Sequence, residues 1–474
     1  MEIVVQKIKK EDFIYLFILL SPILDVFSSI INFGSFSPSL FIRPIIPLIL
    51  LIYIFIKDKK TRKYLITAGF IYILFAIVHL LLYRDLITGI SYGGIIYEAS
   101  YLCNYTYLIF TLFLFLYLFK DKDKNKLNRT FVIYTTIYII SIYLSIITNT
   151  AGSTYVEGAG YKGWFNTGGA VGSIFISSLF ILIPYLFNNK KHFTLKVLLI
   201  ASIIFYLCFL LGTRVGLLGG IIVLFCYIAF QIFCSITKTN KIVFKNILTS
   251  CALLIVTILG LFAIGSESIN RRQDLADLAG KVPDVEENTV VDLDETIYMA
   301  YDLVKLKVQI ENNIISEEYM SKEQQRALLE LDKYSSKNKL ASTDVRKQQL
   351  LYHRFLYQEQ NNIFLKLFGN GYLTNAGNLT LEMEIIALFY NFGIIGFVIF
   401  IGPFFLIFGY GLYKGVKNIR QINVSYLMLL AGCFMTYMIS FLAGHTYFNS
   451  SVMIVIVLLH TLLLEKAFLL KKEK

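Results

Sequence analysis

Residues 197–234 read VLLIASIIFYLCFLLGTRVGLLGGIIVLFCYIAFQIFC, and this stretch decides the fold. It holds a single charged side chain, Arg214, near its middle. A helix needs about 20 apolar residues to cross about 30 Å of hydrocarbon. The stretch is therefore long enough for two membrane spans, 197–213 and 215–234, that are joined by a tight turn at 212–214.

Similar apolar runs recur along the chain, separated by polar segments. They fall at 13–33, 40–56, 64–82, 101–119, 130–149, 169–187, 246–265, 385–412, 422–442 and 451–469. Only 16% of all residues are charged, whereas soluble domains contain about 25%. The sequence therefore predicts an all-α fold, a polytopic transmembrane helical bundle of about 12 spans.

One segment, 267–380, has the composition of a soluble protein instead. We expect it to form a large helical extracytoplasmic loop between spans 1–9 (residues 1–266) and spans 10–12 (residues 381–474). Ser321 with Gln324 has the spacing of a capping box, which predicts a helix to about residue 333. A second helix is expected over 342–360. Helical spacing places these side chains on one of its faces: Arg346, Leu350, His353 and Tyr357.

The net charge of +12 has a topological origin. In a soluble protein it would suggest nucleic acid as a partner. Here most Lys and Arg residues gather in short segments on one side of the predicted membrane, so the positive-inside rule places that side in the cytoplasm. The sequence thus predicts a multi-pass cell-membrane protein with cytoplasmic N- and C-termini. Its charges face anionic membrane lipids rather than nucleic acid.

Charged groups inside a membrane are functional candidates, because placing them there costs free energy. Arg214 fits a guanidinium that grips a phosphate bidentately, although a turn residue reaching toward headgroups explains it as well. Arg346 and Arg354 offer further anion contacts, or simply belong to a solvated loop helix. Asp25 and Arg43 lie on the first two spans and are interpreted as a structural ion pair.

Three acid–base candidates lie near the same predicted surface. Glu382 and Glu384 precede the apolar run from 385, and His445 lies between the last two spans. A carboxylate or histidine in such a place could orient or deprotonate a hydroxyl. The alternatives are acids at headgroup level, acids paired with Arg346 or Arg354, and an interfacial polar turn around the histidine.

Trp164 and Asn166 lie at the entrance of the span that begins near 169. An interfacial tryptophan ordinarily anchors a helix at the membrane surface. An amide beside an aromatic ring also suits a sugar, so both residues are candidates for sugar binding.

The order of five short stretches resembles the O-antigen ligase/O-antigen polymerase superfamily over about residues 150 to 450. The stretches are Gly-Trp-Phe-Asn at 163–166, Gly-Thr-Arg at 212–214, Ser-Thr-Asp-Val-Arg at 342–346, Gly-Asn-Gly-Tyr at 369–372 and Gly-Ile-Ile-Gly at 393–396. Members join lipid-linked surface oligosaccharides.

The resemblance implies roles for particular residues. Arg214 and Arg346 match arginines thought to hold the pyrophosphate of the lipid carrier. A His-Asn pair often precedes the family's Gly-Ile-Ile-Gly stretch, but Glu382 and Met383 stand there in this chain. The acid pair and a late Gly-His motif look like a Gram-positive subgroup, which makes Glu382, Glu384 and His445 the candidates for acceptor activation.

The implied reaction polymerises undecaprenyl-pyrophosphate-linked oligosaccharide repeat units into a surface polysaccharide, such as a capsule or exopolysaccharide, at the outer leaflet. A flippase and a chain-length regulator are candidate partners. We expect no cofactor, and no metal, since no Asp-x-Asp-like metal motif stands out near the predicted site. Two alternatives stay open: a ligase that transfers the glycan to a cell-surface acceptor, and a transporter or flippase. Transporters usually place polar residues at the bilayer midplane, whereas the charges here gather outside.

Overall fold

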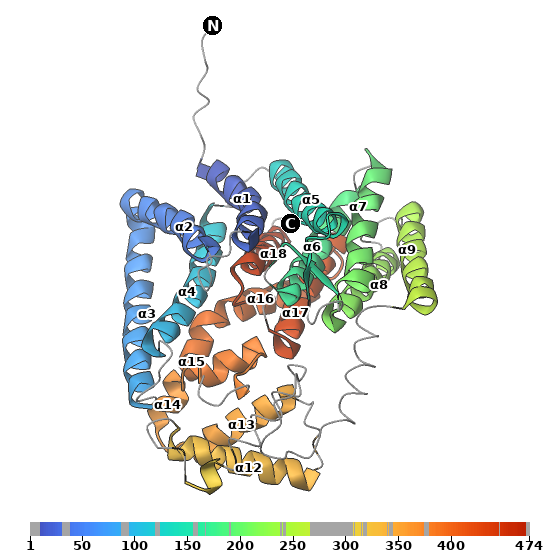
Figure 1. Cartoon of the computed structure of the whole chain (residues 1–474). Coiled ribbons are helices and arrows are strands. Elements are labelled where there is room, and N and C mark those ends of the chain that lie inside the picture. Colours follow the sequence, from blue (N-terminus) through green and yellow to red (C-terminus); the bar gives the residue numbers. More distant parts are fainter. Residues whose placement is uncertain are drawn as a thin grey trace.

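The computed structural model describes residues 10–30, 38–86, 94–118, 124–154, 160–165, 167–188, 191–237, 239, 243–265, 307, 309–313, 315, 320–338, 340, 345–373, 379–444 and 446–470. Nearly all of them lie in helices (Figure 1). The bundle helices are α1 (Lys10–Ile30), α2 (Pro38–Lys57), α3 (Lys59–Leu86), α4 (Gly94–Leu118), α5 (Lys124–Ile147), α6 (Gly168–Asn188), α7 (Phe193–Phe205), α8 (Arg214–Ile236), α9 (Phe244–Ile264), α15 (Glu384–Phe400), α16 (Gly402–Lys417), α17 (Val424–Leu442) and α18 (Ser450–Leu469).

Each of the twelve predicted apolar runs coincides with a helix or a bent helix pair. Among the described residues, nine helices are long and apolar enough to cross a membrane, and α15 with α16 forms a tenth candidate span that is bent by 49°. The prediction of an all-α polytopic membrane protein is confirmed. α6 runs through the middle of the bundle, and nearly all of its residues are buried.

The tight turn expected at 212–214 is present. α7 continues into a π-helical turn, η2 (Tyr206–Leu210), and α8 begins at Arg214. Thr213 caps α8 by accepting a hydrogen bond from the Gly216 N–H at 3.0 Å. Gly212 has φ of +77°, a left-handed conformation that glycine adopts without strain. These features reverse the chain within a few residues.

The helices α12 (Lys322–Asn338), α13 (Val345–Glu359) and α14 (Ile363–Phe368) lie beyond one end of the bundle (Figure 1). We call this end, where α6, α8 and α18 begin, the loop face. The predicted capping box is confirmed, because Ser321 and Gln324 exchange hydrogen bonds of 3.0 and 3.3 Å. α12 and α13 pack around buried side chains of their own, including Leu328 and Tyr352.

The expected division at 266, 267 and 380 stays a prediction. Residues 266–306 lie outside the described part of the chain, so the first boundary of this segment falls there, whereas Thr380 and Leu381 at its second boundary are described.

The predicted Asp25–Arg43 pair is confirmed and belongs to a buried network. Arg43 is 1% exposed, forms an ion pair with Asp25, and donates to the Ser450 and Ser451 hydroxyls at 2.7 and 2.8 Å. Ser451 in turn donates to Asp25 at 2.7 Å. Because a buried charge is tolerated only when it is paired and hydrogen bonded, this network fixes α1 and α2 against the start of α18.

Candidate functional site

Glu384 holds the chain segment that follows α17. Its carboxylate, 5% exposed at the start of α15, accepts hydrogen bonds from three consecutive backbone N–H groups. These belong to Thr446 and Tyr447, each at 2.6 Å, and to Phe448 at 3.3 Å. Hydrogen bonds from several N–H groups to one carboxylate hold the chain that carries them in place. Glu384 therefore positions the segment on which the candidate histidine, His445, lies.

Glu382 contacts the same segment through its backbone. Gly444 lies so close to the Glu382 carbonyl that an added Cβ atom would come within 2.6 Å of its oxygen. His445 itself lies outside the described residues. Its two neighbours contact the acids: Gly444 lies against the Glu382 carbonyl, and the Thr446 N–H donates to Glu384. The residues that flank His445 are therefore next to the other two acid–base candidates.

Arg346 on α13 contacts the chain segment 382–384, which carries Glu382 and Glu384 and which we call the acid segment. Its Nε lies 3.3 Å from Glu382 Oε2, and the two side chains are 53% and 48% exposed. An exposed pair of this kind contributes little to stability, roughly 0–1 kcal/mol. The pair does place a guanidinium and a carboxylate next to each other at the loop face.

The predicted face of α13 is the face that packs on the acid segment. Leu350 packs against the cluster of Leu381, Met383 and Ala387. Further along, His353 lies 5.9 Å and Tyr357 5.8 Å from the Tyr390 ring, measured between ring centroids. His353 is buried, which lowers its pKa to about 4 despite its hydrogen bond with the Leu379 carbonyl. Arg354 lies on α13 with an exposed side chain.

Arg214 is exposed at the first turn of α8, on the same loop face. A series of contacts leads to it from the acid segment. Thr446 lies 3.4 Å from the Ser173 hydroxyl on α6. The adjacent Gly172 faces the turn before α8, where an added Cβ would meet Leu211 at 3.0 Å and Thr213 at 3.7 Å.

A short hairpin lies against the same turn. β1 (Gly152–Ser153) pairs with β2 (Tyr161–Gly163). Thr154 donates to the Leu211 carbonyl at 2.7 Å, and Tyr206 donates to the Tyr161 carbonyl at 2.9 Å. The stretches around 163 and 212, which are far apart in sequence, are therefore neighbours in the fold.

The two sugar-binding candidates follow this hairpin. Trp164 is partly buried, and its indole N–H donates to the Thr150 hydroxyl at 2.8 Å, a contact that also suits an anchoring role. Asn166 lies outside the described residues. The sugar-binding assignment of both residues stays a prediction.

The glycine-rich stretches at 369–372 and 393–396 cross each other. The Asn370 and Gly371 N–H groups donate to the Tyr390 and Asn391 carbonyls at 3.1 and 2.8 Å. Gly369, Gly371 and Gly393 all have positive φ, and Gly393 interrupts the helical geometry of α15. A side chain at either Gly369 or Gly393 would collide with the other backbone segment. Glycine is therefore required for this close approach.

Sequence reasoning missed a buried pair that anchors this crossing. His79 Nε2 on α3 lies 2.8 Å from Glu98 Oε1 on α4, and both side chains are fully buried. Glu98 accepts from the Tyr372 N–H at 2.8 Å, and His79 Nδ1 lies 2.6 Å from the Phe368 carbonyl oxygen. The cost of placing ionisable groups in apolar helices is the signal that could have identified both residues.

Tyr372 links the anchored crossing to the segment after α17. Its ring stacks on Tyr101 with centroids 3.6 Å apart, and Tyr101 lies 4.8 Å from the Phe448 ring. Among the described residues, no group of three or more His, Cys, Asp or Glu side chains has an arrangement that could hold a metal ion. The stack of Tyr372 on Tyr101 thus connects the backbone crossing with the segment after α17.

Residues 7–469 match the family described as O-antigen ligase like membrane protein, which is nearly the whole chain. No curated protein matches the chain.

Proposed function

The chain belongs to the family of O-antigen ligase like membrane proteins, and from this premise we propose that it polymerises lipid-linked oligosaccharide repeat units. The family supports a membrane enzyme of the glycan ligase or polymerase kind. The finer proposal is that the donor is an oligosaccharide on undecaprenyl pyrophosphate, and that the reaction takes place at the outer leaflet. In this proposal the loop face is extracytoplasmic and both termini are cytoplasmic.

The observation that carries the proposal is the convergence at the loop face. One contiguous set of contacts joins four parts of the chain. They are the segment before α15 with its acid candidates, the residues on either side of His445, Arg346 on α13, and the turn that presents Arg214. A lipid pyrophosphate lies at a membrane surface with its tail in hydrocarbon, and this set lies at one end of the membrane-spanning helices.

The proposed chemistry is the displacement of a diphosphate by a sugar hydroxyl. The acceptor oxygen bonds to the anomeric carbon of the donor, the bond from that carbon to the diphosphate oxygen breaks, and the lipid diphosphate departs with the electron pair. Arg214 and Arg346 stabilise the negative charge that grows on the leaving group, with Arg354 close by on α13. Glu382 or His445 takes the proton of the acceptor hydroxyl.

Glu384 has a narrower role in this proposal. Its carboxylate is engaged by three backbone N–H groups, so we assign it to positioning the 446–448 segment and His445. Trp164 and Asn166 are assigned to sugar contacts beside the turn that leads to Arg214.

Ligation is the second candidate within the same family. Both reactions use the same donor and the same leaving group, and only the acceptor differs: the end of another lipid-linked repeat in polymerisation, or a different cell-surface molecule in ligation. A flippase and a chain-length regulator are proposed as working partners of the polymerase.

Reconstitution separates these functions. The purified protein in liposomes receives lipid-linked repeat units as the sole substrate, and products are separated by size. A ladder of lengthening chains without any nucleotide supports the polymerase. Transfer only when a second acceptor is added supports ligation. Movement of single repeats between leaflets without any new glycosidic bond would instead establish a transporter.

A further inference from the structure

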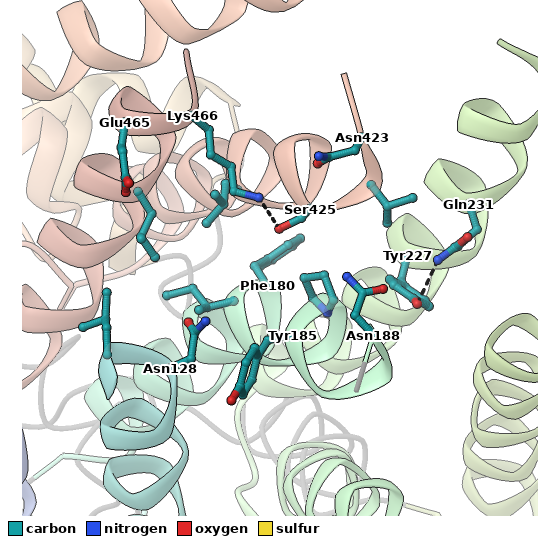
Figure 2. Close-up of a pocket in the computed structure, with 16 residues that line it drawn as sticks. Asn128, Phe180, Tyr185, Asn188, Tyr227, Gln231, Asn423, Ser425, Glu465 and Lys466 are labelled. Atoms are coloured by element: carbon teal, nitrogen blue, oxygen red, sulfur yellow. Dashed lines mark hydrogen bonds between the residues drawn. The ribbon is translucent and has the colours of Figure 1, made fainter. Parts of the chain in front are cut away.

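A pocket lies at the end of the bundle opposite the loop face. It has a volume of about 410 Å³, within the range of about 300–1,000 Å³ that small-molecule sites occupy. Five helices contribute to it: α5, α6, α8, α17 and α18 (Figure 2). The residues that line it include Asn128 near the start of α5 and Asn188 at the end of α6. No residue assigned to the proposed reaction lines this pocket.

Polar side chains from near the helix ends line part of the pocket. They are Asn128, Asn188, Gln231, Asn423, Ser425 and Lys466. Two hydrogen bonds between lining residues hold some of these polar side chains in place. Lys466 Nζ donates to the Ser425 hydroxyl at 2.6 Å, and Gln231 donates to the Tyr227 hydroxyl at 2.9 Å (Figure 2).

The floor of the pocket is apolar. Phe180 and Leu429 are buried there. Phe180 precedes Asn188 by about two helical turns, or about 12 Å along α6. The polarity of the pocket therefore changes along the helix axes, from polar at the end of the bundle to apolar toward its middle. A lipid in that leaflet has the same gradient, with its headgroup at the surface and its chains toward the centre.

The lining chemistry favours an uncharged, hydroxyl-rich headgroup over a phosphate. Amide side chains carry both donors and acceptors, and hydroxyl groups of a sugar also do both. Phosphate oxygens in their ionised form only accept. Glu465 lines the pocket beside Lys466, so the two formal charges offset each other and an anion gains no net attraction.

We propose that this pocket binds the sugar headgroup of a neutral glycolipid in the leaflet opposite the candidate site. The headgroup hydroxyls contact the amides of Asn128 and Asn188, and the start of the acyl chains lies against the apolar floor. The inference does not depend on the polymerase proposal, because it uses none of the residues at the loop face.

The test measures lipid binding to the purified full chain in detergent by native mass spectrometry. The probes are a dihexosyl diacylglycerol, phosphatidylglycerol and the free disaccharide. The dihexosyl lipid is expected to bind saturably and to be displaced weakly by the other two. The Asn128→Leu/Asn188→Leu double variant should weaken its binding about tenfold, since each lost hydrogen bond contributes modestly.

Gln421→Leu is the matched control. Gln421 carries an exposed amide at the same end of the helix bundle, and it does not line the pocket. It should leave binding within about twofold. If the double variant unfolds at a lower temperature than the wild type, Asn188→Leu alone is used, since that side chain is exposed, and at least about threefold weaker binding is expected.

Three results would each overturn the proposal. They are displacement by phosphatidylglycerol as strong as by the dihexosyl lipid, equally tight binding of the free disaccharide, and unchanged binding in a folded pocket variant. The first would indicate an unselective lipid contact, and the second a site for a soluble sugar.

Discussion

Arg346 Nε lies 3.3 Å from Glu382 Oε2, so α13 and the segment before α15 are joined by opposite charges. In the proposed reaction these two side chains have different partners: Arg346 meets the diphosphate, and Glu382 meets the acceptor hydroxyl. The pair then has to open or be shared when substrate binds. Because both side chains are about half exposed, opening it costs little free energy.

Substituting Arg346 tests its contact with the donor. Arg346→Ala should lower kcat/KM for the lipid-linked donor at least about tenfold, because a charge-assisted hydrogen bond contributes about 1.5–3 kcal/mol. Arg346→Lys should recover only part of the loss, since lysine lacks the bidentate geometry. Lys347→Ala is the control, because Lys347 is an exposed cation on the same helix. Equal kinetics in the alanine and control variants would remove Arg346 from the site.

Glu384→Gln should lower kcat while leaving the donor KM nearly unchanged. In the wild type, the N–H groups of Thr446, Tyr447 and Phe448 donate to the two carboxylate oxygens of Glu384. Glutamine offers these three N–H groups only one acceptor oxygen. The expected loss of stability is about 1–3 kcal/mol, measured by thermal unfolding in detergent. Glu330→Gln, on exposed α12, serves as the control. A Glu384→Gln protein with normal turnover would rule out the positioning role.

Gly371→Ala should destabilise the protein by more than about 1 kcal/mol. Gly371 has φ of +71°, and an added Cβ would collide with the Tyr83 ring and lie 3.1 Å from Glu98 Oε2. Gly409→Ala in α16 is the control, because the space around that position is open and alanine favours a helix. Unfolding temperatures that fall equally in both variants would contradict the structural account of the crossing.

Helices α12 and α13 should lose stability in acid because of His353. Its pKa is lowered to about 4 by burial, below the unfolded value of about 6.5. The unfolded chain therefore binds more protons between these values, and stability falls as the pH is lowered through that window, by on the order of 3 kcal/mol. Hydrogen exchange of α13 at pH 7 and pH 4.5 measures this effect.

A His353→Gln variant separates this effect from the titration of the acids. Its amide can donate to the Leu379 carbonyl that His353 contacts at 3.1 Å, and it does not titrate. The variant should show a smaller loss of protection between the two pH values. The same loss in both proteins would assign the pH dependence to other groups.

Much of the fold followed from local sequence signals. The apolar runs located the helices, the capping box located α12, and helical spacing identified the face of α13 that packs on the acid segment. The Asp25–Arg43 pair was predictable because each charge needs a partner inside a membrane, and few partners lie on neighbouring spans.

The remaining features depend on contacts that sequence spacing does not encode. The partners of Glu384 are backbone N–H groups more than sixty residues away, and any residue except proline supplies such a group. The crossing of Gly371 with Asn391 is likewise made by backbone atoms. His79 and Glu98 stand out in sequence as ionisable groups in apolar helices, but their backbone partners at Phe368 and Tyr372 follow only from the fold.

In the proposed reaction, Arg214 and Arg346 together hold a lipid diphosphate at the loop face. The most direct test of this role is the affinity of a polyprenyl diphosphate for the wild type, Arg214→Ala, Arg346→Ala and the double variant, with the polyprenyl monophosphate as reference. Each single variant should weaken diphosphate binding at least about tenfold. The double variant should lose the preference for the diphosphate over the monophosphate. Folded single variants that bind the diphosphate as tightly as the wild type would contradict this role.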